Sequence, residues 1–239
     1  MILSEPPPTQ ADLHFRLFGF PVRIHPFFWV VAILLGLGGG PADPLNTLIW
    51  VAVVFVSILV HEMGHAIVQR YFGGHPWITL YSFGGLASCN DCDRRPRSQI
   101  LISLAGPFAG FFLAAFVVSV LFALQRLQGF ELSWMPIEWE RFHTMADAVV
   151  FYLLFVNIIW GLVNLLPIYP LDGGQIARQL FTMWNARTGT VLSLQLSAGA
   201  ASLVTAYAAL KGDFYLALMF GFLAYGSFQG IQFYRNHWR

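Results

Sequence analysis

The chain has 239 residues, of which 57% are hydrophobic and 10% are charged, and its mean hydropathy is +0.63. A soluble globular domain typically carries about 25% charged residues, so this composition excludes an ordinary soluble protein and indicates an integral membrane protein. The formal net charge is +1 and no basic run is present, so nothing in the sequence indicates a nucleic-acid partner.

The first segment, residues 1–23, contains two acidic residues and three consecutive prolines, and it lacks the basic-then-apolar order of a secretory signal peptide. We therefore expect a short cytosolic segment that is disordered or lies on the membrane surface. Residues 24–239 are expected to form a single transmembrane domain, with its core in residues 44–186.

Six apolar segments are candidates for membrane-spanning helices, because about 20 apolar residues are needed to cross a hydrocarbon core roughly 30 Å thick. They cover approximately residues 24–37, 44–72, 100–124, 146–166, 190–210 and 214–233. The sequence therefore predicts an all-α polytopic membrane protein with about six transmembrane helices. The connections between these segments leave no room for an inserted soluble domain.

The Lys and Arg residues predict the orientation in the membrane, since cytosolic loops carry an excess of both. With the N-terminus in the cytosol, only three of the 13 basic residues fall on the outer side. We therefore predict a multi-pass protein of the cell membrane whose two termini are both cytosolic.

The second segment has a readable start and end. Asp43 is suited to cap a helix that begins with Pro44, and Gly73-Gly74 can end it. A helix of about 28 residues is about 42 Å long, so it must tilt or protrude from the membrane. His61 then lies about 25 Å along the axis, inside the membrane in its cytosolic half.

This second segment reads His61-Glu62-Met63-Gly64-His65 near its middle. Two histidines four residues apart share one helix face and can bind one Zn²⁺ through their imidazole nitrogens. Glu62 points about 100° away from His61, where it can contact a zinc-bound water and remove its proton as a general base. Ionisable side chains inside a membrane are costly and usually functional, which favours a zinc site over a chance pattern. Gly64 would allow another helix or a substrate backbone to approach closely.

Residues 77–88 are rich in β-forming side chains and include Gly84-Gly85, which predicts an extended segment after the second helix. Its edge could hold an extended substrate by strand addition, or it could be a plain interfacial hairpin. The following Cys89 and Cys92 have no second pair that would complete a zinc site. We expect them to be reduced and inert, with redox sensing or pairing between subunits as alternatives.

After the fourth segment, Pro167 and Pro170 remove backbone donors and predict a break in the helix. Irregular backbone at membrane depth is tolerated where it lines a cavity. Asp172 follows this break at the membrane level of the histidines and could be the third zinc ligand, or it could cap the short helix that follows. Asn164, one turn before the break, could hydrogen-bond a substrate carbonyl or a developing oxyanion, or a neighbouring helix.

Two motifs together, His61-Glu62-x-x-His65 and Asn164-x-x-Pro167-x-x-x-Leu171-Asp172-Gly173, closely resemble the site-2 protease family of intramembrane metalloproteases. The resemblance covers about residues 25–174 and is to a minimal form without a PDZ or CBS domain. It implies that His61, His65 and Asp172 bind one zinc ion per chain and that Glu62 is the catalytic base.

The resemblance also implies a small membrane-associated β-hairpin after the second helix, in which Gly84 and Gly85 form a family motif that contacts substrate. Ala105-Gly106-Pro107 in the third segment is similar to another family motif, but Gly110 stands where many members have Asn. We therefore expect Gly106 and Gly110 to form a face of small residues for helix packing.

The function implied by the resemblance is hydrolysis of peptide bonds in or near the transmembrane segments of membrane protein substrates, within the lipid bilayer. Bacterial members commonly release anti-sigma factors or clear remnants of signal peptides, so partners of this kind are expected. Two other interpretations stay open, a transmembrane metal transporter that uses the same three ligands and a catalytically silent membrane scaffold. Glu62 argues for the enzyme, because metal binding alone does not require it.

Overall fold

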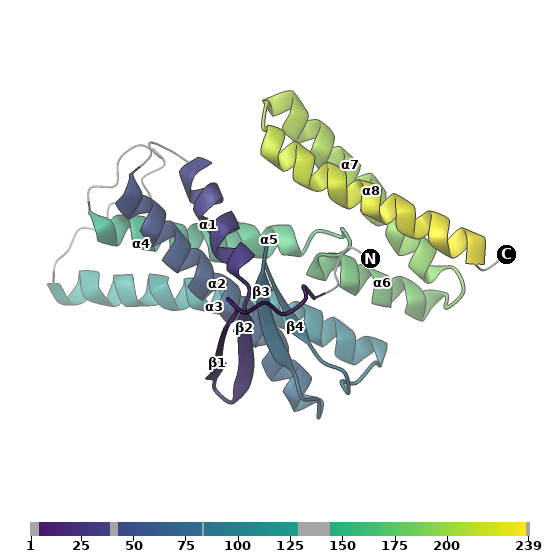
Figure 1. Ribbon diagram of the computed structural model, residues 1–239, viewed down its shortest axis with the longest axis horizontal. Coiled ribbons are helices and arrows are strands. Elements are labelled where there is room, and N and C mark those ends of the chain that lie inside the picture. The colour runs from purple at the N-terminus through teal and green to yellow at the C-terminus, as the bar shows by residue number, and fades with distance from the viewer. Residues whose placement is uncertain (1–4, 39–42, 83, 129–143, 238–239) are drawn as a thin grey trace. The chain divides into compact units, whose positions relative to one another are not determined.

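The computed structural model describes residues 5–38, 43–82, 84–128 and 144–237 (Figure 1). Its strands are β1 (Leu13–Leu17), β2 (Phe20–Ile24), β3 (Trp77–Tyr81) and β4 (Gly84–Ser88). Its helices are α1 (Pro26–Gly38), α2 (Pro44–Tyr71), α3 (Pro96–Gln128), α4 (Met145–Leu154), the π-helix η1 (Phe155–Trp160), α5 (Gly161–Asn164), α6 (Asp172–Trp184), α7 (Gly189–Lys211) and α8 (Phe214–His237). The predicted fold class, helical with a small β element after the second helix, is confirmed.

The chain divides into two compact units. The first, which we call the sheet unit, consists of residues 5–92 and 105–161 and contains the four strands with α1, α2, α4 and η1. The second, which we call the helical unit, contains residues 93–104 and 162–239 and therefore α6, α7 and α8. Each unit is described by itself below.

The four strands of the sheet unit form one mixed sheet in the order β1-β2-β3-β4. β1 and β2 are antiparallel, β2 and β3 run parallel with Val22 opposite Ile78, and β3 and β4 are antiparallel with Leu80 opposite Gly85. The predicted hairpin is therefore present as β3 and β4, and it is one half of a larger sheet.

Strands β1 and β2 arise from the segment that the sequence predicts to be disordered or to lie on the membrane surface. Phe20, Val22 and Ile24 alternate along β2 and are all buried, which explains why this segment pairs with β3. Glu5 accepts hydrogen bonds from the side chains of Trp77 and Thr79 in β3 and so holds the start of the described chain on the sheet. The pairing of β2 with β3 spans more than fifty residues, so short-range patterns do not reveal it.

Within the described residues, five helical stretches are long and apolar enough to cross a membrane, and each coincides with a predicted span. They are Pro44–Tyr71, Pro96–Leu124, Met145–Asn164, Gly189–Lys211 and Phe214–Asn236. The remaining predicted span, which is the first in the chain, forms α1. Its 13 residues cover about 20 Å and so fall short of a hydrocarbon core roughly 30 Å thick. The expected span, residues 24–37, is itself only about 21 Å long, and in the structure its first residue, Ile24, ends strand β2.

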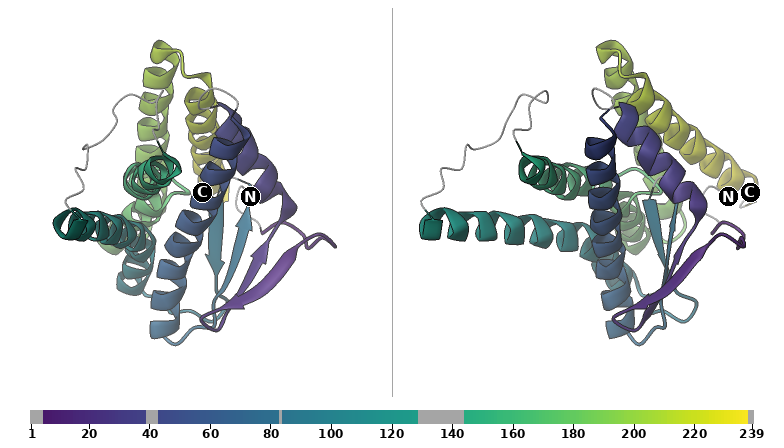
Figure 2. Two further views of the ribbon diagram at one scale, coloured as in Figure 1. Left: turned by 90° about the vertical axis from the view of Figure 1, so that its left-hand side faces the viewer. Right: turned by 60° about the vertical axis from the view of Figure 1, so that its left-hand side comes forward.

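Helix α2 begins and ends where the sequence predicts. The Asp43 side chain accepts a hydrogen bond from Leu45 N at 3.1 Å, and Pro44 occupies the first turn. Gly73, just beyond the helix, has a φ of +87°, which favours glycine. α2 runs beside the sheet (Figure 2), and apolar residues of both elements, including Val54, Ala66 and Leu80, form the core of the sheet unit.

In the helical unit, α7 and α8 lie side by side as an antiparallel pair joined by a short turn (Figure 1). Gly212 in this turn has a φ of +78° and ends α7. Ile168, Ala201 and Phe220 form the buried core of the unit, so the segment that follows the predicted helix break is packed against the α7–α8 pair.

Candidate metal centre

Two imidazoles meet on one face of α2. The Nε2 atoms of His61 and His65 lie 3.1 Å apart, and the ring centroids are separated by 4.8 Å. Two nitrogens on one tetrahedral zinc ion, each bonded at about 2.0–2.1 Å, lie about 3.3 Å apart. The spacing of the two nitrogens therefore suits two ligands of a single ion.

Helix α3 approaches these imidazoles through a glycine. A Cβ at Gly106 would lie 2.7 Å from His61 Nε2 and closer still to the ring of His65, so no other residue fits without displacing them. In return, a Cβ at Gly64 would overlap the carbonyl of Ala105 and lie 2.8 Å from Ala109 Cβ. The close approach predicted at Gly64 and the small-residue packing at Gly106 are confirmed, and the histidines lie against helix backbone.

Glu62 lies between the two histidines in sequence, but its side chain contacts strand β4. A Cβ at Gly85 would lie 2.8 Å from both Cδ and Oε1 of Glu62, whereas the same position at Gly84 is open. Glu62 is buried. Burial of the Tyr81 side chain at the end of β3 raises the pKa of Tyr81, and the charges of Glu62 and Glu5 make smaller contributions in the same direction. Of the two predicted glycines, Gly85 is therefore the one that adjoins the proposed base.

Further contacts join α2 to β4 beyond Glu62. Gln69 Nε2 donates a hydrogen bond to the carbonyl of Ala87 at 3.0 Å. A Cβ at Gly74, just past the end of α2, would overlap the two cysteine sulfurs that follow β4. We call this series of contacts, from Glu62 with Gly85 to Gly74, the α2–β4 seam; β4 is the edge strand of the described sheet.

Asn157 is a polar residue near the site that the sequence reasoning did not single out. It is buried in the π-helix η1, and its Nδ2 donates to Ser57 Oγ at 2.9 Å and to the Leu153 carbonyl at 2.8 Å. Ser57 lies one turn before His61 on α2, and a Cβ at Gly110 would lie 3.2 Å from Asn157 Oδ1. An amide inside an apolar span is itself a signal of function or of helix–helix hydrogen bonding, and it could have been used.

Asp172 and Asn164 belong to the helical unit. Asn164 is the last residue of α5, and Asp172 is the first residue of α6. The N-cap position of α6 is Leu171, which makes no side-chain capping hydrogen bond, so the alternative in which Asp172 caps this helix is wrong. Gly173 explains the tight turn, because a Cβ there would overlap the Leu165 carbonyl.

The loop before Asp172 is anchored by two serines of the α7–α8 pair. Tyr169 N donates to Ser197 Oγ at 2.7 Å, and Ser197 Oγ lies 2.7 Å from Ser227 Oγ. Both serines are buried, so their hydrogen bonds are protected from water. This role could not be predicted from the sequence, since a serine in an apolar helix usually bonds to its own backbone.

Cys89 and Cys92 form a disulfide with their Cα atoms 5.7 Å apart, so the expectation of reduced thiols is wrong for this structure. The turn between β4 and α3 brings the two side chains together, and the missing side chain of Gly74 leaves room for both sulfurs. His75 binds the intervening Asp91 through its backbone amide at 2.9 Å and through ring Nδ1 at 2.6 Å.

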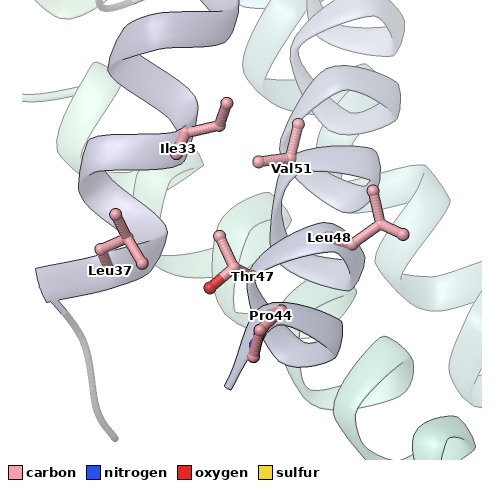
Figure 3. Close-up of a pocket in the computed structure, with 6 residues that line it drawn as sticks. All are labelled: Ile33, Leu37, Pro44, Thr47, Leu48 and Val51. Carbon is pink, nitrogen blue, oxygen red and sulfur yellow. The ribbon is translucent and has the colours of Figure 1, made fainter. Parts of the chain in front are cut away.

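A groove between α1 and α2 lies away from the histidines (Figure 3). Its lining residues are Ile33, Leu37, Pro44, Thr47, Leu48 and Val51. They are apolar except for Thr47, which precedes His61 by about 21 Å along the helix axis. The groove therefore does not belong to the candidate metal centre.

Comparison with known proteins gives one consistent result. The profile of peptidase family M50 matches residues 49–206. Rip3 of Mycobacterium tuberculosis is 29% identical over an alignment that covers 87% of this chain and 55% of that protein. Stage IV sporulation protein FB of Bacillus subtilis is 30% identical over 67% of this chain and 48% of its own length. The chain thus spans about half the length of these curated relatives.

Among solved structures, the site-2 protease from Methanocaldococcus jannaschii superimposes with a TM-score of 0.60 over 92% of this chain and 95% of that one. The two sequences are 23% identical. This likeness shows a shared fold, including helices long enough to cross a membrane.

Proposed function

Since this chain belongs to peptidase family M50, the site-2 protease family, we propose that it is an intramembrane zinc endopeptidase that hydrolyses peptide bonds in or near transmembrane segments of membrane protein substrates. The observation that carries the proposal is the pair of imidazole nitrogens 3.1 Å apart on α2, with Glu62 beside the edge strand β4. A metal site and a carboxylate next to a strand edge are the parts that hydrolysis of an extended peptide requires.

We assign one zinc ion per chain to His61, His65 and Asp172. The donor set fits zinc, because two imidazoles and one carboxylate with an open fourth position are typical of catalytic zinc sites. The backbone at Gly106 also fits, since the missing side chain leaves the space in which the two imidazole nitrogens lie 3.1 Å apart. When bound, zinc polarises a carbonyl and lowers the pKa of a coordinated water to about 7.

Glu62 acts as the general base in this proposal. Its buried carboxylate, held against the Gly85 backbone, accepts a proton from the attacking water and passes it to the leaving amine. The backbone of Gly85 allows the carboxylate to reach the strand edge because no side chain intervenes. Asn164 supplies an amide that hydrogen-bonds the substrate carbonyl as negative charge develops on it.

The edge of β4 at Gly84 and Gly85 receives the substrate as an added strand. A helical peptide has its amides bonded within the helix, so it must unwind before it can be cleaved, and pairing with a strand edge stabilises the unwound form. The substrate is a membrane protein, with an anti-sigma factor or a signal-peptide remnant as the expected kinds. The bilayer is the second partner, and we propose no nucleic-acid partner.

The proposed topology follows from the distribution of basic residues. In this proposal the N-terminal segment, residues 1–23, is cytosolic and supplies β1 and most of β2 to the sheet. Residues 24–239 form the protease domain with its core in 44–186, and both termini are cytosolic. The active site lies in the cytosolic half of the membrane.

Zinc content and cleavage of a transmembrane peptide, measured side by side on wild type and Glu62→Gln, test this function. We expect zinc in both proteins and cleavage only by wild type, because glutamine keeps the shape of the side chain but cannot accept the proton. Asp213→Asn, an acidic residue exposed at the start of α8, is the matched control and should cleave normally. Cleavage by Glu62→Gln at the wild-type rate would refute the mechanism, and zinc without cleavage in either protein would favour a transporter or a scaffold.

A further inference from the structure

The loop between β4 and α3 gathers metal-binding side chains outside the candidate centre. The sulfur atoms of Cys89 and Cys92 and a carboxylate oxygen of Asp91 all lie within 4.8 Å of one another. Asp91 Oδ1 is 3.3 Å from Cys89 Sγ, although a disulfide sulfur carries no proton to donate. This contact is therefore a meeting of two potential ligand atoms and not a hydrogen bond.

His75 holds the carboxylate of Asp91 in place from the other side. The His75 amide donates to Oδ1 at 2.9 Å, and ring Nδ1 lies 2.6 Å from Oδ2. Metal-binding carboxylates are usually fixed by hydrogen bonds of this kind, which orient the oxygen that faces the ion. The Asp91 and His75 side chains are 51% and 88% exposed, so an ion from solution can reach them.

A second feature of the fold leaves space for the two sulfur atoms beside the end of α2. Gly74 ends the α2–β4 seam, and a Cβ at this position would lie 2.7 Å from Cys89 Sγ and closer to Cys92 Sγ. The backbone at this point is therefore packed directly against both sulfurs. Two cysteines separated by two residues on one turn are also the usual half of a tetrahedral thiolate site.

We propose that this loop, when its disulfide is reduced, binds a thiophilic divalent cation, Zn²⁺ by its chemistry, through Cys89, Asp91 and Cys92, with His75 orienting Asp91. The charge distribution predicts that the loop faces the cytosol, where disulfides are rare and paired cysteines more often bind metal. Water completes the tetrahedral shell. The bound ion lies beside Gly74 at the far end of the α2–β4 seam, where the disulfide lies in the oxidised form.

A small thiol can reduce the disulfide before the cation binds. Two equivalents of a low-molecular-weight thiol break the Cys89–Cys92 bond, giving two protein thiols and one oxidised small disulfide. Binding of the cation then displaces the two thiol protons to solvent, leaving two thiolate ligands.

Cobalt is a suitable probe, because thiolate-bound Co²⁺ absorbs strongly in the near ultraviolet and a site without sulfur does not. Full-length protein is reduced with a phosphine. The phosphine is then removed under anaerobic conditions, and the protein is titrated with Co²⁺. We expect the thiolate band in reduced wild type, its absence in oxidised wild type, and its loss when Zn²⁺ is added. The comparison of the two redox forms needs no substitution, so it holds even where a variant fails to fold.

Variants then identify the ligands. Cys89→Ser with Cys92→Ser should abolish the band, and His75→Ala should weaken cobalt binding about 10- to 100-fold, the usual effect of losing an orienting partner. Asp91→Asn should weaken binding more than Asp93→Asn, which removes a carboxylate of the same loop that bonds Arg95 and Ser98 instead.

Absence of the band from reduced wild type at saturating cobalt would overturn the proposal, as would equal weakening by Asp91→Asn and Asp93→Asn. The same titration on Glu62→Gln protein separates this inference from the proposed function. The band does not depend on Glu62, so proteolysis and loop metal binding can each fail without the other.

Discussion

The sheet unit and the helical unit present their proposed zinc ligands in different ways. In the sheet unit, His61 and His65 stand in the middle of a regular helix, and their positions follow from helical geometry and from the close backbone of Gly106. In the helical unit, Asp172 follows an irregular loop that is anchored through Tyr169 to Ser197, nearly thirty residues further along the chain.

The difference shows two ways in which a fold can hold a metal-binding side chain in a defined position. A ligand on a helix is placed by local hydrogen bonds and needs only that nothing displaces its ring. A ligand after a break has lost those local bonds, so distant buried polar groups must hold it. Substitutions in the sheet unit should therefore act by steric overlap with the histidine rings. Substitutions in the helical unit should act by removing hydrogen bonds that hold the loop before Asp172.

The largest expected effect is that of removing the ligand of the helical unit. Asp172→Ala should lower zinc affinity by more than about 100-fold, beyond the usual effect of losing a partner of a ligand, and should abolish cleavage. Equilibrium dialysis against zinc and a peptide cleavage assay measure the two losses. Wild-type zinc affinity in Asp172→Ala would show that the helical unit does not contribute the third ligand.

Gly106→Ala tests collision in the sheet unit. The added methyl group must push the two imidazoles aside, and displacement of catalytic groups by about 1 Å can cost about 100-fold in rate. Gly199→Ala on α7 is the matched control, since its Cβ meets nothing within 4 Å and should leave cleavage unchanged. A similar effect of both substitutions on zinc content and cleavage would contradict the role given to Gly106.

Gly85→Ala tests the role of Glu62 separately from that of the proposed metal ligands. The new methyl group would displace the carboxylate, so cleavage should fall about 10- to 100-fold while zinc content stays constant. Gly84→Ala should cause a smaller loss, because the Cβ position there is open. Single-turnover cleavage by zinc-loaded protein measures the difference, and equal losses would remove the distinction between the two glycines.

The smallest expected effect concerns the anchor in the helical unit. Ser197→Ala leaves the partly buried Tyr169 amide without its acceptor and should lower stability by about 1–3 kcal/mol. Ser193→Ala, which removes a hydroxyl bonded only to the Thr190 carbonyl of the same helix, should cost less. Thermal unfolding in detergent compares them, and a larger loss from Ser193→Ala would refute the anchoring role.

Features encoded by neighbouring residues could be predicted from the sequence. The limits of α2 follow from Asp43, Pro44 and Gly73, and the histidine pair follows from helical spacing. The family and its membrane fold could be inferred from motifs that are themselves local, and the family profile and the structural likeness confirm both.

Features that depend on distant partners could not be predicted. Strand β2 is five residues long, and its place in the sheet depends on pairing with β3, which lies beyond two helices. Ser197 is indistinguishable in sequence from other helix serines until Tyr169 is placed beside it. The disulfide at Cys89 depends on the shape of a turn and on the space at Gly74, neither of which the spacing of the cysteines determines.

The hydrogen bond from Gln69 to the carbonyl of Ala87 has a consequence for the length of substrate that the proposed protease could hold. An added strand needs carbonyl and amide groups along the edge of β4, and the bond to Gln69 already occupies one of these acceptors. Gly84 and Gly85 lie at the other end of β4, where Gly85 is next to Glu62. A peptide that pairs only with this end of β4 would need to unwind about one turn of helix around the cleaved bond.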